Sequence, residues 1–105
     1  METPLEILAE PRRQAILQLI WDRECSAGEI SASFDVSFSA VSQHLARMRT
    51  AQIVQVRKVG RKRYYRARKE TLGPLADYFE SLWRDRLGRL KQQAEAKKRN
   101  ARNEP

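Results

Sequence analysis

The segment from residue 37 to residue 50 carries small polar side chains on one face, and such side chains can hydrogen-bond to the edges of nucleic-acid bases. Val41, Leu45 and Met48 are spaced i, i+4 and i+7, which predicts a helix that buries them. At about 100° per residue, the opposite face of this helix consists of Ser39, Gln43, Ala46, Arg47 and Thr50. The pattern therefore predicts a helix that can enter a groove of a nucleic acid.

The residue types in this helix suggest two kinds of contact. The N-terminal half of a recognition helix usually meets the base edges, so we expect Ser39, Ala40 and Gln43 to read the base sequence. Serine and glutamine hydrogen-bond to bases, and alanine leaves room for a thymine methyl group. Phosphate and other contacts are expected from Ser37, Phe38, Ser42, His44 and Arg47.

These assignments have alternatives. Phe38 could fold back onto the preceding helix instead of touching a thymine methyl group. His44 lies towards the buried face, where a half-buried structural histidine is a better interpretation than a ligand. Serine and glutamine also occur on ordinary solvent-exposed helices, so the polar face alone does not establish a contact with nucleic acid.

A cationic segment follows this helix. Between Arg57 and Lys69 the sequence has eight basic residues and no acidic one. A run of one sign repels itself and so favours a polyanionic partner, although basic residues also serve solubility. Gly60 suits a tight reversal, which predicts a hairpin whose tip could reach a minor groove or flanking phosphates. The expected contacts of the hairpin are Arg57, Arg61, Lys62, Arg63 and Tyr64.

Helices on both sides must position these two surfaces. Thr3 and Glu6 predict a capping box that opens a first helix, and Pro11 opens a second. The apolar stripe of the second helix is expected to consist of Ala15, Ile16, Leu19 and Ile20. Residues 22–25 are predicted to form a polar turn. Another capping box, formed by Ser26 and Glu29, predicts the start of the third helix.

The second half of the chain is predicted to hold the hairpin and one further helix. Ser37 is expected to cap the fourth helix, and the first strand is expected to begin at Ile53. Tyr64 and Tyr65 alternate on the return strand, so one of them should pack in the core. From residue 72 to residue 90, apolar residues recur at steps of three and four, which predicts one long amphipathic helix.

Length and charge limit the kind of protein. With 105 residues the chain has the size of one domain, which we expect to cover residues 1–92, followed by a frayed or disordered basic tail at residues 93–105. A net charge of +8 favours a polyanionic partner, nucleic acid first and an anionic membrane second. The polar helix followed by the basic hairpin makes double-stranded DNA the expected partner. The sequence has no apolar run of membrane-spanning length and no pattern of a secretory signal, so we predict a cytoplasmic protein.

The sequence contains few residues that could act in catalysis or bind a metal. The single cysteine, Cys25, cannot form an internal disulfide or by itself a zinc site. We expect it to be a free structural thiol, with pairing across a dimer as the alternative. The single histidine, His44, leaves little for acid–base catalysis, and no nucleophile constellation or glycine-rich phosphate loop is present. The sequence therefore predicts neither an enzyme nor a cofactor.

Three motifs occur in order: residues 8–13 with Ile16-Leu17, residues 41–45 (Val-Ser-Gln-His-Leu), and residues 60–65 (Gly-Arg-Lys-Arg-Tyr-Tyr). Together they resemble the ArsR/SmtB family of bacterial winged helix-turn-helix repressors. The resemblance implies a mainly α fold with a small β-hairpin and a homodimer formed by the first and last helices. It also implies repression at an inverted-repeat operator, often the protein's own. The implied dimer residues are Leu5, Leu8, Leu75, Phe79, Leu82, Trp83 and Leu90.

The sequence departs from that family in its metal ligands. Many members bind a toxic metal through two cysteines on the third helix, but residues 29–34 contain none. Others bind zinc between the last helices through Asp and His, but the last helix here has Asp77 and Asp85 and no histidine. We therefore predict a metal-independent member without a metal site and with an unknown effector. The alternative function is a non-specific architectural DNA- or RNA-binding module.

Overall fold

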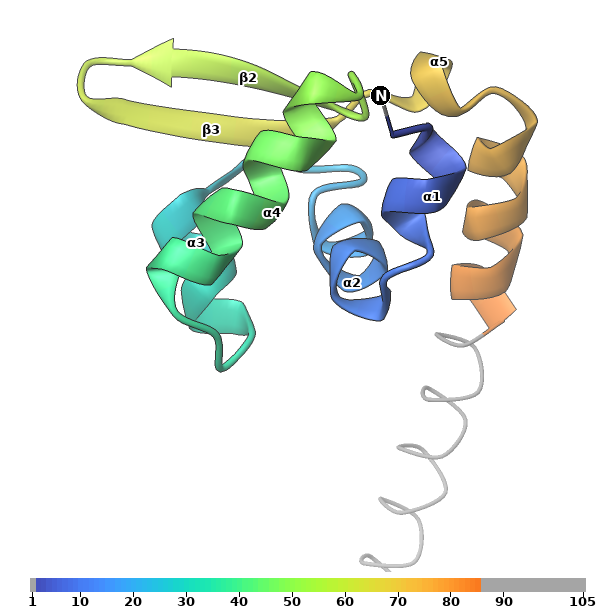
Figure 1. Cartoon of the computed structure of the whole chain (residues 1–105), viewed down its shortest axis with the longest axis horizontal. Helices are drawn as coiled ribbons and strands as arrows, with labels where there is room; N and C mark the ends of the chain where they lie inside the picture. Colours follow the sequence, from blue (N-terminus) through green and yellow to red (C-terminus); the bar gives the residue numbers. More distant parts are fainter. Residues whose placement is uncertain (1, 86–105) are drawn as a thin grey trace, which may run out of the picture. The chain divides into compact units, whose positions relative to one another are not determined.

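The computed structural model describes residues 2–85, and the chain divides into two compact units between Gly73 and Pro74 (Figure 1). The first unit contains the labelled elements, which are, in chain order, α1 (Pro4–Leu8), α2 (Pro11–Leu19), β1 (Cys25–Ser26), α3 (Ala27–Ser33), α4 (Phe38–Thr50), β2 (Val54–Val59), β3 (Lys62–Ala67) and α5 (Lys69–Leu72). The described part of the second unit is a helical segment at residues 74–85.

Side-chain caps begin the helices at the positions that the sequence predicts. The Thr3 hydroxyl accepts from the Glu6 N–H at 3.2 Å, and the Glu6 carboxylate accepts from the Thr3 N–H at 3.0 Å. Ser26 and Glu29 form the same reciprocal pair ahead of α3. Ser37 accepts from the N–H of the third residue of α4 at 3.1 Å. Each cap satisfies N–H groups that the first helical turn leaves without a partner.

The hairpin forms with its reversal at the predicted glycine. Val59 pairs with Lys62, which leaves Gly60 and Arg61 as a two-residue turn in which Gly60 has φ +61°. We call the β2–β3 hairpin the wing, because it projects as an arm beyond the helices of the first unit (Figure 1). The first strand of the wing, β2, begins at Val54, one residue later than predicted.

The structure corrects the expectation of a polar turn at residues 22–25. Cys25 and Ser26 form a short strand, β1, which pairs antiparallel with Tyr65 and Tyr64 of β3 and makes a three-stranded sheet in the order β1-β3-β2. Two residues are too few to show the alternation that marks a strand in a sequence. This strand exists because β3 offers it a free edge.

The core of the first unit is built from buried apolar residues of α1, α2, α3 and α4. Ile16, Leu17 and Ile20 of the α2 region are fully buried, whereas Ala15 and Leu19 of the predicted stripe are half-buried. The apolar stripe of α2 is therefore rotated from the predicted one towards Leu17. The α3–turn–α4 pair followed by the wing is a winged helix-turn-helix, mainly α with a small antiparallel sheet, as the sequence predicts.

The predicted long C-terminal helix is interrupted. α5 ends at Leu72, Gly73 has φ +53°, and helical structure resumes at Pro74. A positive φ is incompatible with a right-handed helix, and proline restricts the residue before it and cannot donate a helical hydrogen bond. The part of the predicted helix near Leu90, and the predicted tail at residues 93–105, lie outside the described residues.

A strained residue ends α4. Gln52 has φ +60°, its N–H donates to Arg49 O at 2.9 Å, and the N–H of Ile53 donates to Met48 O at 2.9 Å. This pair of hydrogen bonds is a Schellman motif, in which glycine is the favoured residue at the left-handed position. The motif turns the chain directly from α4 into β2.

We expect Gln52→Gly to raise the free energy of unfolding by about 1 kcal/mol, because glycine removes the steric cost of the left-handed conformation. Urea denaturation followed by circular dichroism measures the change. Gln55→Gly, at an exposed extended position of β2, is the matched control and should lower stability by about 0.5–1 kcal/mol. A loss of stability in both variants would contradict the inference of strain at Gln52.

Candidate nucleic-acid interface

α4 exposes the face that the sequence predicts to meet a nucleic acid. Val41, Leu45 and Met48 are at most 1% exposed, so they anchor the helix in the core. The exposed residues on the opposite side are Ser39, Gln43, Ala46, Arg47 and Thr50. Of the expected base-reading residues, Ser39 and Gln43 are exposed, and Ala40 is half-buried on the flank. Their contacts with bases stay predictions.

A buried arginine connects α4 with the two N-terminal helices. Arg13 of α2 is only 8% exposed, and its Nε donates to Nδ1 of His44 at 3.2 Å. Its NH1 group donates to the backbone oxygen of Ile7 in α1 at 3.2 Å. The guanidinium thus holds three helices together and sets how α4 is presented. Sequence reasoning missed Arg13, although its spacing of three, four and seven residues from Ile16, Leu17 and Ile20 places it on the buried face. The predicted stripe through Ala15 and Leu19 obscured that signal.

His44 is the half-buried structural histidine that the sequence favoured, rather than a free side chain on the surface. Partial burial lowers the pKa of His44 from its ordinary value of 6.5. The Glu10 carboxylate acts in the opposite direction, and three guanidinium groups, those of Arg13, Arg12 and Arg47, lower the pKa further. The neutral ring that results can accept the hydrogen bond from Arg13. The predicted phosphate contact of His44 stays untested.

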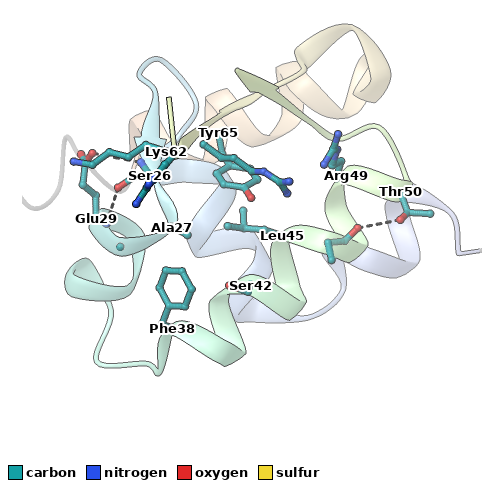
Figure 2. A pocket seen from close by; sticks show the side chains of 14 residues that line it. Ser26, Ala27, Glu29, Phe38, Ser42, Leu45, Arg49, Thr50, Lys62 and Tyr65 are labelled. Carbon is teal, nitrogen blue, oxygen red and sulfur yellow. Dashed lines mark hydrogen bonds between the residues drawn. The ribbon is translucent and has the colours of Figure 1, made fainter. Parts of the chain in front are cut away.

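A groove of about 1000 Å³ separates α4 from the wing (Figure 2). Phe38, Ser42 and Leu45 line it from α4, and Tyr65 lines it from β3 (Figure 2). The cationic residues at this α4–wing groove are Arg49, Arg61, Lys62 and Arg63. The groove therefore brings Phe38 and Ser42 together with the basic tip, and the Glu29 carboxylate of α3 also lines it. The expected base-reading residues Ser39, Ala40 and Gln43 do not line it.

Two residues of α4 clarify how the groove is used. Phe38 is 59% exposed and lines the groove, so its ring is available to a partner. Arg49 lies seven residues after Ser42, on the same side of the helix, and also lines the groove. Sequence reasoning missed Arg49, although its spacing from Ser42 was a usable signal.

Strand alternation divides the predicted wing residues between two faces. Arg57 pairs with Tyr64, and Lys58 pairs with Arg63, so the two pairs lie on opposite faces of the wing. Arg63 faces the α4–wing groove, whereas Arg57 and Tyr64 lie on the other, outer face. The structure therefore gathers the tip cations of residues 61–63 at the groove and separates Arg57 and Tyr64 from them.

Acidic residues before β1 neutralise the base of the wing. The Glu24 carboxylate accepts three hydrogen bonds from the Arg57 guanidinium, the shortest of them 2.7 Å. The Asp22 carboxylate accepts from Lys69 Nζ at 2.8 Å. In the sequence the basic run from Arg57 to Lys69 has no acidic residue, but in the fold an ion pair neutralises the residue at each of its ends. The positive charge that has no ion-pair partner is therefore concentrated towards the tip.

The remaining predicted positions differ in exposure. Leu5 is 65% exposed, but Leu8 is buried. In the second unit, the Phe79 and Trp83 rings stack with centroids 5.3 Å apart, Leu75 and Leu82 are half-buried, and Tyr78 is 61% exposed. The role of these residues in a dimer stays a prediction, and Leu90 lies outside the described residues.

Cys25 is a fully buried free thiol. Within residues 2–85, Asp, Glu, Cys and His side chains do not gather in any group of three that could hold a metal ion. In the same part of the chain, no helix has both the length and the apolar character needed to cross a membrane.

Sequence comparison places the helical core among bacterial regulators. Residues 10–56 match the family of bacterial regulatory proteins of the arsR type. The transcriptional activator HlyU of Vibrio cholerae serotype O1 is 41% identical over 61 residues, which are 58% of this chain and 56% of that protein. The chain thus spans little more than half of that relative. The transcriptional repressor SdpR of Bacillus subtilis is 28% identical over 65 residues, which are 62% of this chain and 72% of that protein.

Structural comparison extends the similarity over most of the chain. The crystal structure of a possible transcriptional regulator for arsenical resistance is 40% identical, with a TM-score of 0.67. The match covers 89% of this chain and 97% of that one.

We expect Arg13→Met to lower the free energy of unfolding by about 2 kcal/mol, because it leaves the buried Ile7 carbonyl and the half-buried His44 ring without their charged donor. Urea denaturation measures the loss. Arg12→Met, at the exposed neighbouring position, is the matched control and should change stability by less than about 0.5 kcal/mol. Equal losses in the two variants would contradict the bridging role of Arg13.

Stability should also fall as His44 becomes protonated. Because the folded state lowers the pKa of His44, the unfolded chain binds more protons between pH 6.5 and that lower pKa. The stability that depends on the neutral ring is therefore fully present above pH 6.5 and is lost as the pH falls through the lowered pKa.

Thermal melts at a series of pH values from neutral to mildly acidic measure this loss. In His44→Asn, whose side-chain oxygen can still accept from Arg13, the melting temperature should depend less on pH over the same range. The sequence has one histidine, so no other imidazole contributes. The same pH dependence in both proteins would refute the role of His44.

Proposed function

The chain belongs to the arsR family of bacterial regulatory proteins, and we propose that it acts as a homodimeric repressor at an inverted-repeat operator. It is a DNA-binding transcriptional regulator and not an enzyme. The observation that carries this proposal is the α4–wing groove, where an exposed polar helix face adjoins four cationic side chains. One surface suits base edges and the other suits phosphates, and sequence-specific recognition of duplex DNA needs both.

α4 is the reading element of the proposed complex. Its N-terminal half exposes Ser39 and Gln43, with the small Ala40 on the flank, and the core fixes its opposite face. A helix of this width fits the major groove, where each base pair presents a distinct pattern of donors and acceptors. The exposed ring of Phe38 is placed to meet a thymine methyl group or a deoxyribose.

The groove edges are the anchoring element. Arg49 on the helix and the cations of residues 61–63 on the wing face one space, into which one sugar–phosphate strand can enter. Such contacts fix the position of the protein on the duplex without reading its sequence, and they make the affinity depend on salt. The wing tip is then free to approach the adjacent minor groove.

A second copy of the chain would double this surface. Leu5 in the first unit and Tyr78 in the second unit are among the exposed large apolar residues, and each supports an apolar contact with a second copy. A symmetric dimer presents two copies of α4, which matches an inverted repeat whose half-sites lie about one helical turn apart.

Repression follows from occupation of a promoter, the protein's own promoter among the candidates. The repressor SdpR supports this direction of regulation, although HlyU is an activator. We propose a metal-independent member, because α3 lacks cysteine and the single histidine is engaged by Arg13. The effector is unassigned. We propose a cytoplasmic location, which a DNA partner supports.

The proposal predicts that reading and anchoring can be separated by mutation. Gln43→Ala should reduce the preference for operator over random duplex by about 1–3 kcal/mol, because it removes a contact to a base edge. Arg61→Ala should weaken both duplexes alike and reduce the slope of log K against log salt by about 0.9, because it removes one phosphate contact. Salt titrations on an operator selected from a random-sequence library measure both quantities.

The wild-type protein supplies the control. Equal affinity for selected and random duplexes would favour the rival function, a non-specific architectural DNA- or RNA-binding module. Sedimentation tests the dimer separately, and a monomer at micromolar concentration would count against it. If both substitutions acted alike on preference and on the salt slope, the division between reader and anchor would be wrong.

A further inference from the structure

The outer face of the wing base carries a row of three side chains that links the turn before β1 with β2. Tyr64 of β3 pairs with Arg57 of β2 and with Ser26 of β1. The Arg57 guanidinium lies over the Tyr64 ring, 5.4 Å from its centroid, and reaches the Glu24 carboxylate just ahead of β1. One guanidinium thus crosses the middle strand of the sheet to meet a carboxylate at its far edge.

The contact between Glu24 and Arg57 uses one complete edge of the guanidinium. Arg57 Nε donates to both carboxylate oxygens, at 3.1 and 3.0 Å, and NH2 donates to Oε2 at 2.7 Å. This hydrogen bonding lowers the pKa of Glu24 and raises the pKa of Arg57, so both groups stay charged. The Arg57 side chain is nevertheless 62% exposed, so burial does not keep a partner away from it.

A phosphate and a carboxylate compete for the same donors. The fork of an arginine fits either group through two parallel hydrogen bonds. In the folded protein Glu24 occupies the Nε–NH2 edge of Arg57, and its negative charge also repels a phosphate that approaches the remaining NH1 donors. The tip cations Arg61, Lys62 and Arg63 form no ion pair among the described residues, although Glu29 lines the same groove, so the two parts of the wing differ in what they offer to DNA.

We propose that Glu24 determines where DNA contacts the wing, by holding Arg57 away from phosphate and confining the contact to the tip and α4. This inference rests on the proposed DNA-binding function. It reverses the expectation from the sequence that Arg57 is a DNA contact. Glu24 is a positioning residue here, since it acts through Arg57 and does not itself touch the ligand.

The proposal predicts that an acidic residue can be removed to create a DNA contact. In Glu24→Gln the carboxylate is lost and Arg57 becomes free to bind a phosphate. The slope of log K against log salt should then become steeper by about 0.9. If the new contact adds nothing at 1 M salt, that slope corresponds to about eightfold tighter binding at 0.1 M salt.

The experiment compares wild type, Glu24→Gln, Arg57→Gln and the double variant, by salt titration on a random-sequence duplex. We expect Glu24→Gln to raise the affinity and steepen the salt slope only where Arg57 is present. Arg57→Gln alone should change both quantities little. Glu70→Gln makes the same change in net charge at another exposed position and should change affinity by less than twofold. Thermal melts establish that all variants are folded.

Three results would overturn the proposal. An equal gain in the Arg57→Gln background would mean that net charge alone explains the effect. If Arg57→Gln alone made the slope of log K against log salt shallower by about one unit, Arg57 would already bind phosphate in the wild type. No gain in Glu24→Gln would mean that freeing Arg57 creates no contact. Arg61→Gln, measured alongside, separates these cases from failure of the proposed function, because an unchanged slope there would remove the wing from DNA binding altogether.

Discussion

The presentation of α4, the helix that we propose to bind DNA, depends on one buried positive charge. Arg13 donates to Ile7 O in α1 and to His44 in α4, and it is itself part of α2. A guanidinium can be buried at low cost only if its donors are satisfied, so the three helices have to adopt the arrangement that satisfies it. Among the described residues, no buried side-chain nitrogen or oxygen lacks a partner. The orientation of α4 is thus held by a directional contact as well as by apolar packing.

The same contact couples the interface to protonation. His44 follows directly after Gln43, so the residue that accepts from Arg13 adjoins one that we expect to read bases. The neutral ring is required for that hydrogen bond, and burial together with three nearby arginines favours the neutral ring. The exposed face of α4 therefore sits on a support whose geometry depends on the protonation of His44, a group whose pKa burial lowers.

The wing shows how the alternation of a strand assigns different roles to similar residues. Neighbouring residues within β3 point to opposite faces, so Arg63 reaches the α4–wing groove while Tyr64, with Arg57 over its ring, lies on the outer face. Glu24 then compensates Arg57, and the groove cations are left for a polyanion. Charge density in the sequence overstates the charge that is available to DNA, because strand pairing brings acidic residues beside basic ones.

The sequence by itself determined the features that depend on near neighbours. These features are the caps at Thr3, Ser26 and Ser37, the buried face of α4 and the reversal at Gly60. Each involves residues that lie close together along the chain, so spacing and residue type were sufficient to predict it. The interruption at residues 73–74 was also readable from Gly-Pro, but the regular apolar spacing on both sides obscured it.

Only the tertiary structure decided the features that join distant segments. Strand β1, the bridge from Arg13 to His44 and the pair of Glu24 with Arg57 connect residues about 30 or more positions apart. Local propensity carries no information about such pairings, because a polar residue on a helix or in a turn looks the same whether its partner is water or a distant side chain. The folded chain supplies the partner and thereby decides which residues support the DNA-binding surface and which remain free to form it.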